Sequence, residues 1–148
     1  TIGFGGFGET LPYHENRMYL NREKKDKFGM PTVVFDADLR ENEKKMRVDM
    51  MNDAAEMLER SGVKNVNTYD RGSYLGMAIH EMGTARMGRD PKTSVLNAYN
   101  QVWGAKNVFV TDGACMTSAS CVNPSLTYMA LTARAADHAV KELKRKNL

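Results

Sequence analysis

The strongest constraint on the fold is an apolar stripe that recurs at helical spacing between residues 39 and 60. Charged side chains occupy the opposite positions of this segment, as expected for a helix with one buried face. Asp38 followed three residues later by Glu41 has the form of a capping box, and Gly62 suits the position just beyond a helix end. The pattern therefore predicts a helix over about residues 39–60, with an apolar face made by Met46, Met50, Ala54, Met57 and Leu58. Such a methionine stripe either fills a core or binds a partner, and core filling is its commoner use.

Several short segments have the composition of β-strands. Residues 16–21 alternate in character, and residues 31–35 are β-branched and aromatic, with a charged, glycine-ended connection between them. We expect these two segments to be neighbouring antiparallel strands. Further extended segments are predicted at residues 63–69, 74–79, 95–96 and 101–103, and a buried strand at residues 107–111.

The end of the chain predicts a second helix, from Pro124 to about Lys146. Asn123 suits the N-cap position and Pro124 the first helical position. The predicted buried stripe of this helix consists of Leu126, Met129, Ala130, Ala133, Ala136, Val140 and Leu143. Two helices and several short strands indicate the α+β class, with an antiparallel sheet and packed helices.

Composition and charge exclude several classes of function. The 148 residues carry 21 basic and 18 acidic side chains, a net charge of +3, and much of the excess lies in residues 141–146. This basic tail contains no aromatic residue and lies where cations favour a helix end, so we predict no nucleic-acid partner. No apolar run approaches the roughly 20 residues needed to span a bilayer, so no membrane span is predicted. The sequence has no recognisable signal peptide and does not begin with methionine, so we expect it to be part of a longer polypeptide.

Several motifs fail on context or spacing. The glycines of residues 3–8 match a dinucleotide-binding pattern, but no strand precedes them and no helical period follows. His80 begins a zinc-binding pattern, yet Thr84 stands where the second histidine is required, so no metal site is predicted. Cys115 and Cys121 are six residues apart, and the sequence leaves open whether they form a disulfide.

Two polar residues stand out as candidates for chemistry. His80 lies in a Gly/Thr-rich loop, and the chain has only three histidines, so few groups can transfer protons near neutral pH. Asn123 stands at the start of the final helix, where free backbone N–H groups favour negative charge. On spacing alone, a structural role is the commoner outcome for either residue. The strand end at Asp112 and Gly113 and the loop after it precede the same helix, which favours a functional role.

Three ordered motifs carry a resemblance to a known family. They are His-x-x-Gly-Thr-x-x-Met-Gly at residues 80–88, Asn-Val-Phe-Val-Thr-Asp-Gly at residues 107–113, and Asn-Pro-x-x-Thr at residues 123–127. Together, in this order and at this spacing, they resemble the C-terminal part of the glucose–methanol–choline (GMC) flavoprotein oxidoreductases. Residues 16–20 and 41–43 are also similar to substrate-domain segments of that family, so the resemblance covers most of the chain. Among subgroups, it is closest to the bacterial sugar and polyol dehydrogenases and the pyranose oxidase-like branch.

The resemblance implies oxidation of the CH–OH group of an alcohol or sugar, with FAD as cofactor. It makes His80 the base that takes the hydroxyl proton and Asn123 the amide that binds the substrate oxygen. The cofactor-binding residues implied in the same way are Asp112, Gly113, Pro124 and Ser125. Residues 1–105 would be the C-terminal part of the substrate-binding domain. Residues 106–148 would be the C-terminal strand, loop and helix of the FAD-binding domain.

The family binds its dinucleotide through an N-terminal fingerprint that is absent from this sequence. The resemblance therefore implies the N-terminal FAD-binding domain of a parent chain as a partner. We expect the 148-residue chain alone neither to hold FAD tightly nor to turn over, and its apolar surfaces to favour self-association. Two alternatives stay open: a non-enzymatic interaction module that uses the methionine-rich helix, and a flavoprotein lyase on the same scaffold. The bacterial cytoplasm and periplasm are both compatible with this interpretation.

Overall fold

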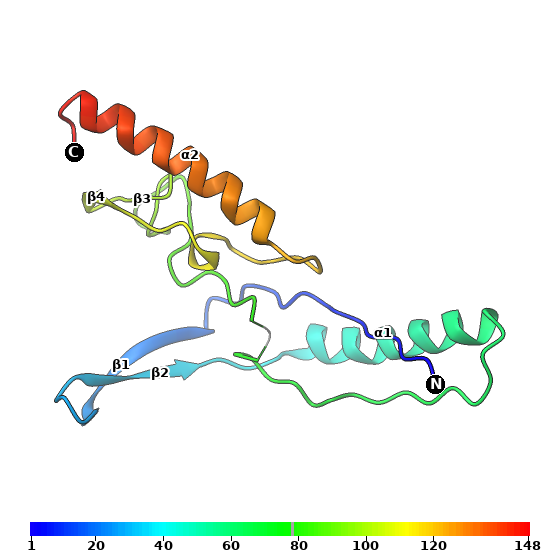
Figure 1. Cartoon of the computed structure of the whole chain (residues 1–148). Helices are drawn as coiled ribbons and strands as arrows, with labels where there is room; N and C mark the ends of the chain where they lie inside the picture. The colour runs from blue at the N-terminus through cyan, green and yellow to red at the C-terminus, as the bar shows by residue number, and fades with distance from the viewer. Residues whose placement is uncertain (78) are drawn as a thin grey trace. The chain divides into compact units, whose positions relative to one another are not determined.

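The computed structural model of the chain describes residues 1–77 and 79–148. These residues form two α-helices, two antiparallel sheets of two strands each and one short 3-10 helix (Figure 1). This content agrees with the predicted α+β class. The chain divides into two compact units, Thr1–Ala78 and Ile79–Leu148, and each is described by itself. The predicted domain boundary between residues 105 and 106 refers to a longer protein and stays a prediction.

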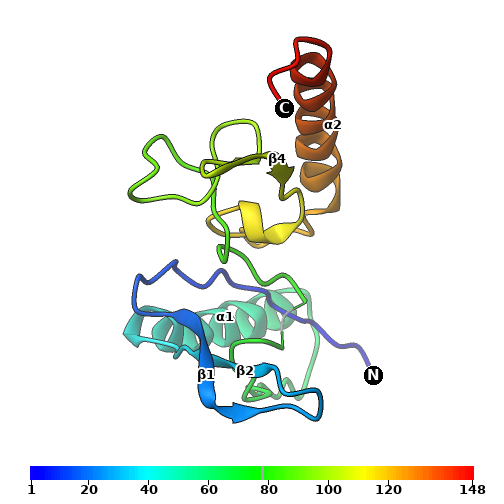
Figure 2. The ribbon, with the colours of Figure 1, turned by 90° about the vertical axis from the view of Figure 1, so that its left-hand side faces the viewer.

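The first unit contains a β-hairpin. β1 (Arg17–Lys25) pairs antiparallel with β2 (Pro31–Asp36), and Figure 2 shows the two strands side by side. The turn is closed by Asp26, whose Oδ1 accepts hydrogen bonds from the backbone N–H groups of Phe28 at 2.8 Å and Met30 at 2.9 Å. An aspartate that bonds the backbone two residues ahead is a common device of turns. The predicted pair of neighbouring antiparallel strands is confirmed.

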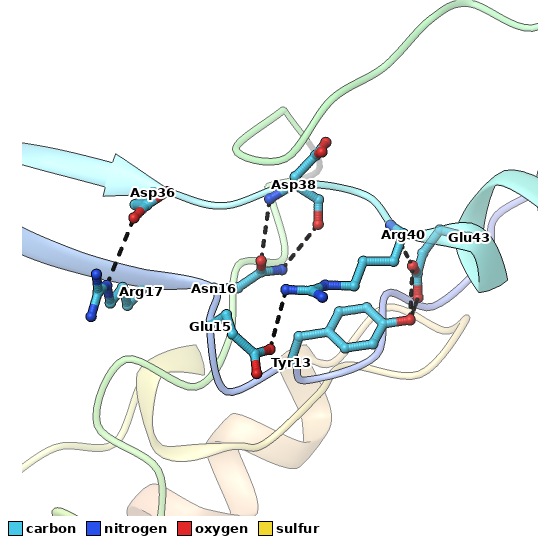
Figure 3. Close-up of polar contacts among 8 residues, drawn as sticks. All are labelled: Tyr13, Glu15, Asn16, Arg17, Asp36, Asp38, Arg40 and Glu43. Atoms are coloured by element: carbon cyan, nitrogen blue, oxygen red, sulfur yellow. Dashed lines mark hydrogen bonds and ion pairs between the residues drawn. The ribbon is translucent and has the colours of Figure 1, made fainter.

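The first helix, α1 (Glu41–Arg60), begins two residues later than predicted. Its N-cap is Arg40, whose backbone N–H donates to Glu43 Oε2 at 3.0 Å, so the predicted capping box at Asp38 is wrong by two positions. Asp38 lies outside the helix because it pairs with Asn16. The Asn16 Nδ2 donates to the Asp38 carbonyl, and the Asp38 N–H donates to Asn16 Oδ1, both at 3.2 Å (Figure 3).

The Glu43 carboxylate ties the N-terminal segment to α1 (Figure 3). Glu43 is only 1% exposed, and it accepts hydrogen bonds from the backbone N–H of Leu11 at 3.1 Å and from the Tyr13 hydroxyl at 3.1 and 3.2 Å. The Arg40 guanidinium lies over the Tyr13 ring, 4.9 Å from its centroid, and pairs with Glu15 at 3.2 Å. A buried carboxylate that accepts several hydrogen bonds fixes the segments that supply the donors.

The methionine stripe of α1 is covered in part by the N-terminal segment, which runs along the helix in Figure 1. A Cβ atom on Gly8 would lie 2.5 Å from Met46 Cε, and one on Gly6 would lie 3.5 Å from Met50 Sδ. The glycines therefore let the main chain pass close over these side chains. Met46 and Met50 are half-buried, whereas Met57 is 57% exposed. Part of the stripe thus fills a small core, the commoner of its two predicted uses.

The chain after α1 is a loop. The strand predicted at residues 63–69 is wrong, because the described residues there form no β-pairing and Asn65 has a left-handed φ of 59°. The strand predicted at residues 74–79 includes residue 78, which lies outside the described residues. Its described part at residues 74–77 is loop and turn, with Gly76 at φ 89°. Both predictions rested on local composition, and a strand also needs a neighbour to accept its hydrogen bonds.

The second unit is built around Leu96, which is completely buried. β3 (Gln101–Val102) pairs antiparallel with β4 (Ala105–Phe109), and Leu96 forms isolated bridges to Met87 and Val102. The extended segment predicted at residues 101–103 is thus present at 101–102, and the one predicted at residues 95–96 is reduced to the bridges of Leu96. β4 begins two residues before the strand predicted there, and its three central residues are exposed, so the predicted burial is not observed.

The second helix, α2 (Ser125–Lys144), is present as predicted but turns a different face to its unit. On the inner face, Ala135 is 2% exposed, and the His138 ring stacks on Tyr99 with centroids 4.1 Å apart. The stripe predicted to be buried faces outward, and its most exposed members are Leu126, Met129, Val140 and Leu143. Because small apolar residues lie on both sides of this alanine-rich helix, its sequence identifies a helix without deciding which side is covered.

Candidate functional site

The loop that carries His80 lies against a short 3-10 helix, η1 (Gly113–Cys115). We call residues 80–88 the His80 loop. Two backbone hydrogen bonds join it to η1: the Ala85 N–H donates to the Ala114 carbonyl at 3.0 Å, and the Met87 N–H donates to the Cys115 carbonyl at 2.9 Å. The loop that carries the predicted base therefore lies beside the segment that follows Asp112 and Gly113.

His80 itself is half-buried. It follows Ile79, whose φ of 58° lies in the left-handed region that a β-branched residue rarely adopts. Strained backbone of this kind persists only where the surrounding contacts hold it, and it is enriched at functional sites. The conformation of Ile79 thus adds an observation in favour of a role for the His80 loop.

Two glycines allow the His80 loop and η1 to approach closely. A Cβ atom on Gly113 would lie 2.9 Å from the Glu81 carbonyl oxygen, 2.9 Å from Met82 Sδ and 3.0 Å from the Tyr128 hydroxyl. Gly83 has a φ of 87°, and a Cβ atom there would lie 3.4 Å from the Thr117 carbonyl oxygen. Gly113, predicted as a cofactor-binding residue, therefore has a packing role within the chain in addition to any contact with a ligand.

Asp112 caps η1. Its Oδ1 accepts a hydrogen bond from the Ala114 N–H at 2.9 Å, and the residue is exposed. This bond fixes the direction in which the carboxylate points, since a capping side chain is tied to the first turn that follows it. The observed role is local and structural, and the predicted contact with a cofactor stays a prediction.

The start of α2 leaves its backbone donors accessible. The N-cap is Pro124, so the prediction of Asn123 at this position is wrong by one residue. Pro124 is buried, Asn123 and Ser125 are exposed, and neither a side-chain cap nor an acidic residue is described in the first turn. The first N–H groups of a helix need acceptors from outside the helix, and they favour an electron-rich group. Asn123, which is not used as the cap, can offer its amide to a ligand.

A buried polar cluster around Asn100 joins the end of β4 to α2. Asn100 is completely buried; its Nδ2 donates to the Val110 carbonyl at 3.0 Å, and its Oδ1 accepts from Arg134 of α2 at 3.3 Å. The Cys115 thiol is 1% exposed, and this burial raises its pKa, whereas a hydrogen bond with Asn100 acts in the opposite direction. Cys115 and Cys121 are both free, which settles the question of a disulfide that the sequence left open.

All the predicted site residues belong to the second unit, and Gly113 is the one among them at which separate segments meet. The His80 loop, the Asp112–Gly113 segment and the first turns of α2 are linked through Met82, Gly113 and Tyr128. Sequence reasoning missed Tyr128, because the face of α2 that it occupies was predicted to be solvent-exposed. It also missed Asn100, whose φ of 63° is typical of the asparagines found in turns.

Two other features are absent from the described residues. No group of three or more His, Cys, Asp or Glu side chains in the described part of the chain lies close enough to bind a metal ion. Neither described helix combines the length and the apolar composition needed to cross a membrane.

Comparisons with known proteins identify the family. The model of the GMC oxidoreductase C-terminal region matches residues 12–132. The chain is 36% identical over 136 residues to 2-methyl-1,2-propanediol dehydrogenase of Mycolicibacterium austroafricanum, covering 89% of this chain and 24% of that protein. It is 34% identical over 130 residues to paromamine 6'-oxidase of Streptomyces fradiae, covering 84% of this chain and 23% of that protein.

A third relative is named as a flavoprotein. The gluconate 2-dehydrogenase flavoprotein of Pantoea cypripedii is 30% identical over 154 residues, covering 99% of this chain and 25% of that protein. The chain therefore spans about a quarter of the length of the curated relatives it matches. Because the family model covers most of the sequence and two relatives exceed 30% identity, the chain belongs to the GMC oxidoreductases.

Proposed function

We propose that this chain is the C-terminal part of a flavin-dependent enzyme that oxidises a CH–OH group of an alcohol or sugar. The family match supports this, and so do the relatives, which include dehydrogenases of 2-methyl-1,2-propanediol, fructose and gluconate and an oxidase of paromamine. The single observation that carries the proposal is the close approach of Glu81 and Met82 in the His80 loop, and of Tyr128 in α2, to Gly113 of η1.

The residues at this junction fit a bound flavin. The start of α2, which no side chain caps, offers backbone N–H groups from Ser125 onward to an electron-rich ring, and no acidic residue in the described first turn opposes it. Pro124, which has no N–H, would lie beside the ring. Asp112 and Gly113 would approach the ribityl–phosphate part of FAD from η1. When bound, FAD supplies the acceptor for the hydride that leaves the carbinol carbon of the substrate.

The chain's own residues would manage the proton and the substrate oxygen. His80, half-buried in its loop, would take the hydroxyl proton on an imidazole nitrogen, since histidine is the side chain that most often serves as a general base. The exposed amide of Asn123 would donate to the same oxygen and fix its direction. Partial burial of His80 would limit the access of water to the proton once the alcohol is bound.

The proposed domain division assigns residues 1–105 to a substrate-binding domain and residues 106–148 to the end of an FAD-binding domain. The rest of the FAD-binding domain would belong to a longer polypeptide, about four times the length of this chain in the relatives. We therefore expect the purified 148-residue chain to lack a bound-flavin absorption spectrum. A stoichiometric flavin spectrum in that preparation would contradict the proposed division.

The decisive experiment is the substitution His80→Asn in the full-length flavoprotein. Under anaerobic conditions, the rate of flavin bleaching by a panel of sugars and alcohols is measured by stopped-flow absorbance. We expect the rate to fall by about 10²–10⁴-fold while the flavin content stays the same, since general-base catalysis contributes this much. The matched control is His14→Asn, at an exposed position of the first unit, and its rate should equal that of the wild type.

Two results would contradict the proposal in different ways. Unchanged bleaching in His80→Asn would remove His80 from the mechanism. Absence of bleaching of the wild-type flavin by every alcohol and sugar tested would remove the oxidoreductase assignment and favour a lyase on the same scaffold.

A further inference from the structure

We propose that Tyr128 is a positioning residue that sets the spacing between the His80 loop, η1 and the start of α2. This inference rests on the proposed function, because it assigns to Tyr128 the task of holding the predicted base and the predicted orienting amide in one arrangement. It concerns a residue that none of the predicted site motifs includes.

The Tyr128 hydroxyl lies where the three segments meet. It donates to Met82 Sδ at 3.5 Å, in the His80 loop, and it would be 3.0 Å from a Cβ atom on Gly113 of η1. Glycine at position 113 therefore leaves the space that the phenol fills. The hydroxyl thus contacts the His80 loop through Met82 and lies close beside the backbone of η1 at Gly113.

The backbone of Tyr128 is equally well placed. Its N–H donates to the carbonyl of the N-cap residue Pro124 at 3.0 Å, and this hydrogen bond closes the first turn of α2. Asn123 directly precedes this proline, so the helix start and the phenol form one rigid piece. An aromatic side chain has only two rotatable angles and loses little entropy when it is fixed. Tyr128 can thus act as a rigid spacer between Asn123 and the His80 loop.

The charges around the phenol keep it protonated. Burial raises the pKa of Tyr128, and the nearby Cys115, Asp112 and Glu81 raise it further. The hydroxyl therefore remains a hydrogen-bond donor at neutral pH and below. A spacer with a constant charge does not add a pH dependence of its own to the base.

The first test measures the arrangement without any reaction. Hydrogen–deuterium exchange is compared in the full-length protein for wild type, Tyr128→Phe, which keeps the ring, and Tyr128→Leu, which removes it. The reporters are the amides of Ala85 and Met87, which donate to η1. We expect exchange there to be faster in Tyr128→Phe and fastest in Tyr128→Leu, and exchange in β3 and β4 to stay the same. The matched control is Tyr99→Phe, whose ring stacks on His138 of the same unit, and it should leave the His80 loop unchanged.

The second test separates positioning from simple stability. In the flavoprotein, Tyr128→Phe should lower kcat for flavin reduction by at least about tenfold with little change in KM, because small displacements of catalytic groups are costly. Its visible circular dichroism should differ from that of the wild type at equal flavin content. Tyr99→Phe should match the wild type in each respect.

Several outcomes would overturn the inference. Unchanged exchange in the His80 loop of both Tyr128 variants would mean that the phenol does not position this loop. Faster exchange spread evenly over η1, β3 and β4 would make Tyr128 an ordinary packing residue. Failure of the proposed function would be recognised separately, since wild-type flavin would then not be reduced by alcohols although the exchange pattern still tests the role of Tyr128.

Discussion

Asn100 shows how one buried amide joins segments that are separate in the sequence. Its side chain bonds Val110 just after β4 and receives a hydrogen bond from Arg134 of α2, while its own carbonyl accepts from the Val110 N–H at 2.9 Å. Asn100 is itself completely buried, so without these bonds its own amide would lack partners. Burial without a partner costs more than the hydrogen bond itself contributes. Asn100 is therefore placed to stabilise the whole second unit.

We expect Asn100→Ala to lower the free energy of unfolding of the second unit by about 1–3 kcal/mol. Trp103, the only tryptophan of the sequence, lies in this unit and donates to Ser94 Oγ at 3.1 Å, so its fluorescence reports unfolding in urea. The matched control, Asn107→Ala, removes an exposed amide of β4 and should change stability by less than about 0.5 kcal/mol. Equal midpoints for the two variants would contradict the role of Asn100.

The Glu43 carboxylate predicts a pH dependence for the first unit. Burial alone would raise its pKa, but hydrogen bonds from the backbone N–H groups of Leu11 and Arg40 and from Asn42 outweigh burial, and the net pKa lies below the ordinary 4.5. A carboxyl whose pKa is lower in the folded state contributes stability above its unfolded pKa. That contribution is lost as the pH falls below about 4.5 and through the lower folded value.

The test of this pH dependence is Glu43→Gln, with Glu41→Gln as its control at an exposed position two residues earlier. The Glu43 variant should be less stable than the wild type at neutral pH, and the difference should shrink as the solution is acidified. Unfolding of the first unit is followed by tyrosine near-UV circular dichroism, to which Tyr13 contributes. A difference that stays constant from pH 7 to about pH 3 would contradict the assignment of the stability to the ionised carboxylate.

At the scale of elements, the sequence predicted the hairpin and the two helices, because short-range patterns determine these elements. The hairpin follows from a β-branched strand and a turn closed by Asp26, and both helices follow from their apolar period. The strand predicted at residues 63–69 failed because pairing is non-local. The exposed face of α2 was predicted wrongly because its covered side depends on Tyr99 and Phe109, whose rings contact His138 and which are distant from it in the sequence.

The candidate site shows the same division. The positions of His80, Asp112 and Asn123 could be singled out because their motifs are short and their chemistry is carried by residue type. The contacts of Gly113 with the His80 loop and with Tyr128 depend on three segments meeting. No single stretch of sequence contains that information.

The two faces of α2 provide a matched pair of substitutions. Ala135 is 2% exposed on the inner face, and Ala133 is exposed on the outer face. Alanine and leucine are both strong helix formers, so helix propensity changes little at either position. Overfilling a packed site costs about 1–3 kcal/mol, so Ala135→Leu should lower the urea midpoint reported by Trp103, whereas Ala133→Leu should leave it unchanged. The opposite order would mean that α2 packs through its outer face in the 148-residue chain.

At the scale of the whole molecule, apolar surface is left uncovered in both units. The outer face of α2 exposes 79% of Leu126, 68% of Met129 and 63% of Leu143. Exposed apolar stripes of this kind mark surfaces that meet another protein surface. In the proposed parent enzyme that surface would be the remainder of the FAD-binding domain, because the chain spans only about a quarter of its relatives.

We therefore expect the 148-residue chain to self-associate through the outer face of α2. Burying each exposed side chain of this size contributes about 1.5–3 kcal/mol, which is enough for association at micromolar concentration when several are buried together. The triple variant Met129→Gln, Val140→Gln and Leu143→Lys keeps helix-forming residues and removes three of the four most exposed side chains of the stripe. Sedimentation velocity should show the wild type shifting to larger species with concentration and the triple variant staying monomeric, with equal helicity by circular dichroism.

The control variant is Met57→Gln, at a 57% exposed position of α1, and it should associate like the wild type. Monomeric wild-type chain at high micromolar concentration would show that this face needs no partner.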